Sequence, residues 1–88
     1  MPHIIRVMDH REKLLRIFNA YCGATRTSEA RVSTIVLNGG HRIGSIQAGA
    51  SFTVRTYERA LEWFSANWPE NAVWPDGVER PIHTEDAA

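Results

Sequence analysis

The 88-residue sequence predicts an all-α fold: a compact domain of four helices followed by an extended tail. Three observations support this prediction. Apolar residues recur at spacings of three and four, helix-capping residues precede these stretches, and glycine or proline follows them. Hydrophobic residues make up 43% of the chain, a proportion typical of a globular domain and too high for a disordered one. A chain of this length forms one small domain.

The first helix is predicted to run from Asp9 to Tyr21. Asp9 and Glu12 have the spacing of a capping box, in which each side chain accepts a hydrogen bond from the backbone of the other residue. Gly23 is expected to end the helix. Residues 1–8 are expected to form an N-terminal arm, although a short strand or an early turn of the same helix would also fit them. The apolar residues at helical spacing are Leu14, Leu15, Phe18, Tyr21 and Cys22.

A second helix is expected to begin near Thr27 or Ser28, where residues suited to helix capping precede an apolar face. It is predicted to end at about Leu37. The β-branched residues within 32–36 leave a strand as the alternative. Asn38 and the two glycines after it predict a turn, since asparagine and glycine both tolerate a positive φ.

The third predicted helix is short and covers about residues 40–48. Ile43 and Ile46 lie three residues apart and form a thin buried stripe. Gly49 is expected to close the helix. The polar side chains left facing outward are His41, Arg42, Ser45 and Gln47.

A fourth helix is predicted to begin after Thr53 and to extend to Trp68, where Pro69 stops it. Its apolar stripe consists of Val54, Tyr57, Ala60, Leu61, Phe64 and Trp68. The rest of the chain, residues 69–88, is rich in proline and is expected to be extended, with its tryptophans packed back on the core. The last residues, 83–88, are expected to be frayed.

The charged residues are unevenly distributed along a chain whose net charge is zero. Residues 1–59 contain nine Lys and Arg against four Asp and Glu, a net charge of +5, whereas residues 60–88 contain one against six, a net charge of −5. Such asymmetry can place one positive face on a neutral protein. Ordinary scatter of charges is the alternative interpretation.

Several classes of protein are disfavoured by the sequence. The single cysteine, Cys22, cannot form an internal disulfide. The sequence shows no signal peptide and no run of ~18 apolar residues. We therefore expect a cytoplasmic location without membrane contact. The histidines and Cys22 show no metal-ligand spacing. No nucleophile–base set, carboxylate pair or nucleotide-binding loop is present. We therefore expect no enzymatic activity, no cofactor, no metal and no small-molecule substrate.

The stretch from about Ser28 to Trp68 resembles the lambda-repressor/Cro-like (XRE-type) helix-turn-helix family. The matching features are the small residue Ser33 within the second helix, the turn, the Ile-x-x-Ile-x-x-Gly pattern at 43–49 and the Thr53-capped amphipathic helix. The ten residues from Ser33 to Ile43 equal the family's spacing between a close helix contact and the recognition helix. The family's turn glycine would fall at residue 37, and here the glycines come later, which predicts a looser or longer turn.

This resemblance implies a helix-turn-helix domain over residues 9–68 that binds duplex DNA as a homodimer and regulates transcription. The helix at 40–48 would enter the major groove, where glutamine pairs with adenine and arginine with guanine or a phosphate. Gly44 would let the backbone approach DNA closely, or else would reflect a helix that needs no rigidity. The implied DNA-binding residues are Gly40, His41, Arg42, Ser45 and Gln47, with Arg26, Arg31 and Arg55 on the DNA backbone.

The Trp-Phe-x-x-Asn-Trp-Pro sequence at 63–69 is similar to small phage-like proteobacterial proteins, which implies a regulator of mobile-element type. A protein-interaction module on the same scaffold, such as an anti-activator, inhibitor or adaptor, is the alternative function. The neutral net charge, the acidic tail and the tryptophans favour it. Trp63, which lies off the apolar stripe of its helix, and Trp74 would then form the partner or dimer surface.

Overall fold

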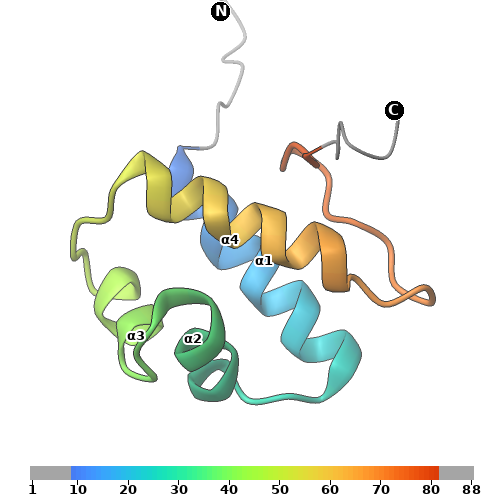
Figure 1. The fold of residues 1–88 in the computed structure, drawn as a ribbon, viewed down its shortest axis with the longest axis horizontal. Helices are drawn as coiled ribbons and strands as arrows, with labels where there is room; N and C mark the ends of the chain where they lie inside the picture. The colour runs from blue at the N-terminus through green and yellow to red at the C-terminus, as the bar shows by residue number, and fades with distance from the viewer. Residues whose placement is uncertain (1–8, 82–88) are drawn as a thin grey trace, which may run out of the picture.

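The computed structural model describes residues 9–81, which form four helices and a C-terminal segment without regular secondary structure (Figure 1). The helices are α1 (His10–Thr25), α2 (Glu29–Leu37), α3 (Arg42–Gln47) and α4 (Val54–Asn67). The all-α, four-helix prediction is confirmed. The predicted arm at 1–8 and the predicted frayed end at 83–88 lie outside the described residues. None of these four helices has the length and apolar composition needed to cross a membrane.

The core lies where α1, α2 and α4 pack against one another, with α3 packed on α1 and α2 (Figure 1). Phe18 of α1 and Phe64 of α4, both fully buried, meet edge to face with ring centroids 5.2 Å apart. All four helices contribute to the buried cluster, and so does the C-terminal segment. Its members are Leu14, Ile17, Phe18, Val32, Leu37, Ile43, Ile46, Tyr57, Ala60, Leu61, Phe64 and Val78.

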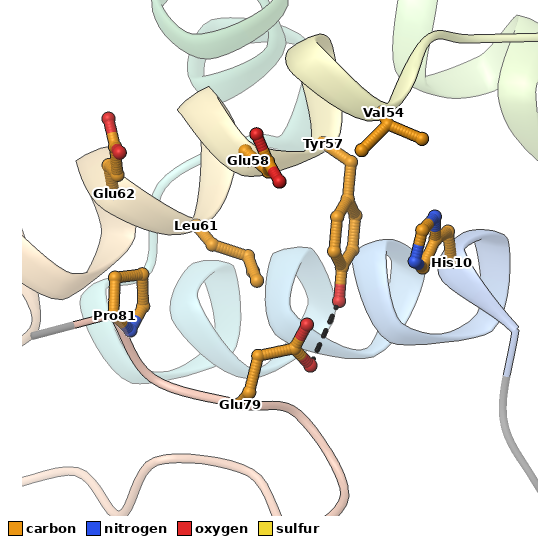
Figure 2. Close-up of a pocket in the computed structure, with 8 residues that line it drawn as sticks. All are labelled: His10, Val54, Tyr57, Glu58, Leu61, Glu62, Glu79 and Pro81. Atoms are coloured by element: carbon orange, nitrogen blue, oxygen red, sulfur yellow. Dashed lines mark hydrogen bonds between the residues drawn. The ribbon is translucent and has the colours of Figure 1, made fainter.

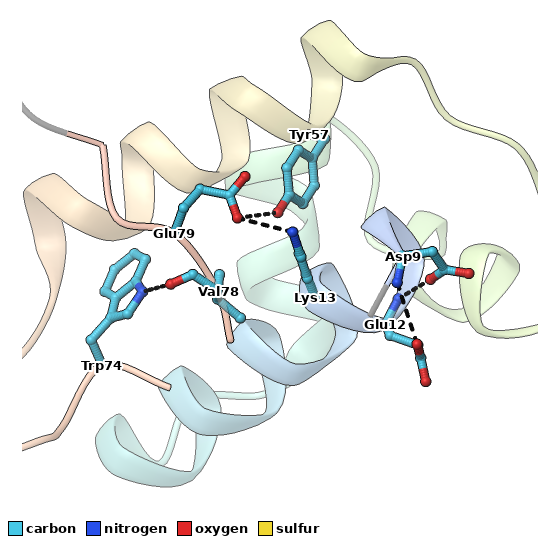
Figure 3. Close-up of polar contacts among 7 residues, drawn as sticks. All are labelled: Asp9, Glu12, Lys13, Tyr57, Trp74, Val78 and Glu79. Atoms are coloured by element: carbon cyan, nitrogen blue, oxygen red, sulfur yellow. Dashed lines mark hydrogen bonds and ion pairs between the residues drawn. The ribbon is translucent and has the colours of Figure 1, made fainter. Parts of the chain in front are cut away.

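Side-chain caps begin three of the helices at the residues that the sequence indicated. Asp9 and Glu12 form the predicted capping box: the Asp9 carboxylate accepts the Glu12 N–H at 2.8 Å, and the Glu12 carboxylate accepts the Asp9 N–H at 3.3 Å (Figure 3). Ser28 and Thr53 each accept a hydrogen bond from the backbone N–H three residues later, at 3.1 and 3.0 Å. These bonds satisfy N–H groups that have no partner within the helix.

The first helix is longer than predicted. It continues through Gly23 to Thr25, and the predicted end at Tyr21 is wrong. The left-handed residue that ends α1 is Arg26, with φ 59°, and its N–H donates to the carbonyl of Cys22. Glycine within a helix costs only about 1 kcal/mol relative to alanine, so it ends a helix only where the next contacts favour a positive φ.

The second segment is a helix, as predicted, and the strand alternative is wrong. The third helix is shorter than predicted, because residues 40 and 41 still belong to the turn. Within this turn the positive φ falls on Asn38, at 67°, and on neither glycine. Gly49, with φ 112°, follows α3 and allows the chain to leave it.

The segment 68–81 packs on the core, and its tryptophans carry much of the contact, as expected. Trp68 is extended, which suits the residue before a proline, and its Nε1 donates to the Ala72 carbonyl at 2.9 Å. Trp74 lies against Trp68, with ring centroids 4.9 Å apart. The Trp74 Nε1 donates to the Val78 carbonyl at 2.7 Å (Figure 3). These bonds let the indole rings be largely covered while their N–H groups remain satisfied.

Candidate nucleic-acid interface

The position of α3 is fixed at its first turn by Ser33. This serine is fully buried in α2 and is the one buried polar side chain among the described residues. Its hydroxyl donates to the Gly39 carbonyl in the turn and accepts the Ile43 N–H at 3.1 Å. The ten-residue spacing noted in the sequence therefore corresponds to a direct hydrogen bond between α2 and α3.

The two turn glycines allow close packing rather than an unusual backbone angle. A Cβ on Gly40 would lie 3.0 Å from Thr34 Oγ1 and 3.3 Å from the Ala30 carbonyl oxygen, so Gly40 packs directly on α2. The Gly39 N–H donates to the Ser33 carbonyl at 3.3 Å, which leaves it unavailable as a phosphate donor. The sequence analysis did not anticipate either contact.

Arg11, which the sequence analysis missed, fixes the other end of α3. From α1 it donates Nε to the Ile46 carbonyl at 3.2 Å, and one terminal nitrogen to the carbonyls of Gly49 and Ala50 at 3.1 and 2.8 Å. A cation at this position bonds carbonyls at and just after the last turn of α3, and its charge complements the negative end of the helix dipole. No local pattern marks Arg11, because its partners lie at least 35 residues away.

Between these two fixed ends, α3 presents a narrow exposed edge. His41 and Ser45 lie four residues apart and are both exposed, as predicted. His41 occupies the N-cap position but makes no capping hydrogen bond with its side chain. A Cβ on Gly44 would meet no atom within 4 Å, so the backbone is open there. The opposite side of the helix is buried through Ile43 and Ile46, also as predicted.

Arg42 and Gln47 do not share this edge. Gln47 donates Nε2 to Glu29 Oε1 at 3.2 Å and lines a shallow hollow with residues of α1. Arg42 donates a terminal N–H to the Leu37 carbonyl at 3.4 Å and lines a cleft with α4. Of the four side chains expected to contact bases, Arg42 and Gln47 therefore reach different neighbouring elements, and His41 and Ser45 remain exposed one helical turn apart.

Four exposed arginines have side chains without a hydrogen-bond or ion-pair partner among residues 9–81. Three of them, Arg26, Arg31 and Arg55, are the arginines expected to contact the DNA backbone. The sequence analysis missed the fourth, Arg59, although its position one turn after Arg55 places both on the same face of α4. Positively charged groups free of protein partners are available to an anionic ligand.

Three carboxylates, those of Glu58, Glu62 and Glu79, line a hollow of about 400 Å³ beside α4 (Figure 2). Glu79 accepts the Tyr57 hydroxyl at 3.3 Å and forms an ion pair with Lys13 at 3.3 Å (Figure 3). A hydrogen bond from its own backbone N–H, together with the Lys13 ammonium, lowers the pKa of Glu79. Burial and the Glu79 charge raise the pKa of Tyr57, whose ring stacks on His10 at a centroid distance of 4.3 Å.

The two tryptophans expected to form a partner surface are largely occupied within the chain. Trp63 is half-buried and meets the Tyr21 ring at 5.4 Å. Trp74 is covered on one face by the Arg80 guanidinium, 4.8 Å from the ring centroid. Neither lines the hollow beside α4.

No group of three or more residues suited to holding a metal occurs in the described part of the chain. Burial raises the pKa of the Cys22 thiol, so its thiolate is disfavoured. Comparisons with models of protein families, with curated proteins and with solved structures found no match.

Proposed function

We propose that this chain is a small helix-turn-helix protein that binds duplex DNA and regulates transcription, with the exposed edge of α3 in the major groove. The observation that carries this proposal is the way α3 is held. Ser33 fixes its first turn and Arg11 fixes its last turn, while His41 and Ser45 face outward. A rigidly held helix with a free polar edge is what base reading requires.

The distribution of charge also supports DNA binding. Arg31, Arg42, Arg55 and Arg59 belong to α2, α3 and α4, and none of them forms an ion pair with a described residue. The acidic C-terminal segment lies away from α2 and α3 (Figure 1). Contacts to phosphates provide most of the affinity of such proteins and require free cations of this kind.

A six-residue helix reaches few base pairs. We therefore propose that two copies bind together, because two half-sites about 34 Å apart compensate for weak single contacts. Within this proposal His41 and Ser45 contact bases, Gln47 reads adenine from the side of α1, and the free arginines contact the DNA backbone.

Binding to duplex DNA can be measured by fluorescence polarisation, with random-sequence duplex and with the chain's own promoter, at several salt concentrations. We expect micromolar or tighter binding at low salt, and an affinity that falls steeply as salt rises. The double variant Arg31→Gln/Arg55→Gln should weaken binding to every sequence and reduce the salt slope by about two. Arg80→Gln is the control, because it removes an arginine from the C-terminal segment, where the Arg80 guanidinium covers Trp74. Absence of binding to any duplex at micromolar protein would refute the proposal.

The hollow beside α4 favours a second candidate function, that of a protein-interaction module. Glu58 and Glu62 face it, and Val54, which is 54% exposed, forms part of its rim (Figure 2). Carboxylates around an apolar floor complement a basic segment of a partner protein with interspersed apolar residues.

A synthetic peptide of alternating leucine and arginine is a suitable probe for this second function. We expect Glu58→Gln/Glu62→Gln to weaken its binding at least fivefold, with Glu70→Gln, outside the hollow, as the control. Equal binding by all three proteins would argue for nonspecific attraction and against a site in the hollow.

A further inference from the structure

A small cleft lies between α4 and the turn that joins α2 to α3. Its volume is about 170 Å³; α4 forms one wall, and the end of α2, the turn and the start of α3 form the other. Polar and charged groups dominate it, and no carboxylate lines it. The lining residues are Val36, Leu37, Asn38, Arg42, Thr56 and Arg59.

The two arginines of this cleft carry positive charge that no described residue offsets. Arg59 has no side-chain partner, and Arg42 uses one of its five N–H donors on the Leu37 carbonyl. Glu58 and Glu62, the carboxylates of α4, line the separate hollow beside that helix (Figure 2). Both side chains line one cleft, and an anion bound there would be attracted by both charges.

The Arg42 side chain is held in place before any ligand arrives. Its stem lies against Gly39, where a Cβ would come within 3.0 Å of Arg42 Cγ. The side chain is half-buried, unlike the exposed arginines of the same face. A side chain whose stem is already packed loses less conformational entropy when it binds a ligand.

Thr56 provides a neutral donor in the same cleft. Its hydroxyl oxygen accepts a hydrogen bond from the Thr53 hydroxyl at 3.0 Å, so its own hydrogen is available for a ligand. The Asn38 side chain adds an amide donor at the rim. Two guanidinium groups with a hydroxyl and an amide form a donor set that suits the oxygens of a phosphate group.

We propose that this cleft binds one phosphate group of the DNA backbone, with Arg42 and Arg59 as its two charged ligands. The choice of DNA as the source of the phosphate rests on the proposed function, whereas the recognition of phosphate rests on the cleft alone. Arg42 is thereby assigned to the backbone and not to a guanine. It positions the chain on the duplex without reading sequence.

Inorganic phosphate tests the cleft without DNA. In a ¹H–¹⁵N NMR titration against sodium chloride of equal ionic strength, we expect saturable shifts of the Thr56 amide and of the Arg42 and Arg59 Nε signals. Arg59→Gln should weaken phosphate binding at least fivefold. Arg55→Gln, which removes the same charge one turn away and outside the cleft, should change it less than twofold. Shifts that chloride reproduces, or that Arg55→Gln reduces as much as Arg59→Gln, would overturn the proposal.

Duplex DNA forms the second arm of the experiment. We expect Arg42→Gln and Arg59→Gln each to weaken binding uniformly across sequences and to lower the salt slope by about one. A loss confined to duplexes with one particular base pair would overturn the assignment of Arg42 to phosphate. Circular dichroism checks that each variant is folded. Because Arg59 is exposed, Arg59→Gln should not disturb the fold, and it provides the test on its own if Arg42→Gln unfolds.

The two arms separate this inference from the proposed function. If the cleft binds inorganic phosphate but the chain binds no duplex, DNA binding would be refuted. The cleft would then be a site for the phosphate group of a small phosphate ester. If the chain binds duplex DNA, Arg42→Gln and Arg59→Gln leave the salt slope unchanged, and phosphate causes no NMR shifts, the phosphate site in the cleft would be refuted. The proposal of DNA binding would then stand.

Discussion

The hydroxyl of Ser33 and the backbone N–H of Ile43 form a buried hydrogen bond of 3.1 Å between α2 and the first turn of α3. The same hydroxyl donates to the carbonyl of Gly39, so one side chain of α2 bonds a backbone group of the connecting turn and another of α3. A helix of six residues does not form alone in water, and its position depends on such contacts.

Replacing Ser33 with alanine should therefore destabilise the fold markedly. The substitution leaves the Ile43 N–H buried without an acceptor, which costs about 1–3 kcal/mol. Urea denaturation followed by circular dichroism measures this change. Ser45→Ala, on the exposed edge of the same helix, is the control and should alter the unfolding free energy by less than about 0.5 kcal/mol. Equal effects of the two substitutions would contradict the role given to Ser33.

Alanine substitutions at Gly40 and Gly44 should have opposite effects. Gly44 lies within α3 and faces open space, so Gly44→Ala should stabilise the protein by about 0.5–1 kcal/mol through helix propensity. Gly40→Ala places a methyl group 3.3 Å from the Ala30 carbonyl oxygen and should cost about 1 kcal/mol or more. Thermal unfolding of both variants checks the signs. A stabilised Gly44→Ala protein with weaker DNA binding would show that the backbone approaches DNA at this position.

Arg11→Lys should loosen the last turn of α3. An ammonium group cannot reproduce the donors that a guanidinium extends to the carbonyls of Ile46, Gly49 and Ala50. We expect a loss of about 1–2 kcal/mol, since bonds from a charged donor are stronger than neutral ones but these are partly exposed to solvent. Native-state hydrogen exchange should show faster exchange of the Ala48 to Ala50 amides. Unchanged exchange in this segment would mean that Arg11 does not hold α3.

The stability of the protein should decline in alkaline solution because of Tyr57. Burial and the charge of Glu79 raise the pKa of this phenol, so the folded chain retains a proton that the unfolded chain releases above about pH 10. Stability is unaffected by this group below that pH and falls as the pH rises beyond it. The phenolate absorbance of the wild type minus that of Tyr57→Phe should show one phenol titrating above its ordinary range. Titration at the ordinary value would contradict the packing of Tyr57 against Glu79.

Helix starts could be predicted from the sequence because capping involves residues three positions apart. Asp9, Ser28 and Thr53 all cap helices as expected. Helix ends and turns were less predictable from glycine residues. A glycine can adopt a positive φ, which ends a helix, or can allow another element to pack closely, and the sequence does not distinguish the two roles. Gly23 provides no helix end, and the turn glycine Gly40 provides room for α2.

The candidate site was only partly predictable for a different reason. The exposed edge at His41 and Ser45 follows from helical periodicity, which is local. The separation of Arg42 from Gln47 depends on which neighbouring helix each side chain reaches, and Arg11 meets Ala50 across 39 positions of sequence. Contacts of this kind are set by tertiary packing, and a single sequence carries no pattern for them.

If the chain binds DNA as proposed, the hydrogen bond between Glu29 and Gln47 has opposite effects on the affinity for duplex DNA and on the preference for particular bases. A glutamine amide nitrogen has two hydrogens, so Glu29 can steady the side chain with one and leave the other, with Oε1, for the edge of an adenine. The same carboxylate repels phosphates. Glu29→Ala should therefore tighten binding to duplexes in general while reducing the preference for adenine-containing sites, which competition between two duplexes would measure.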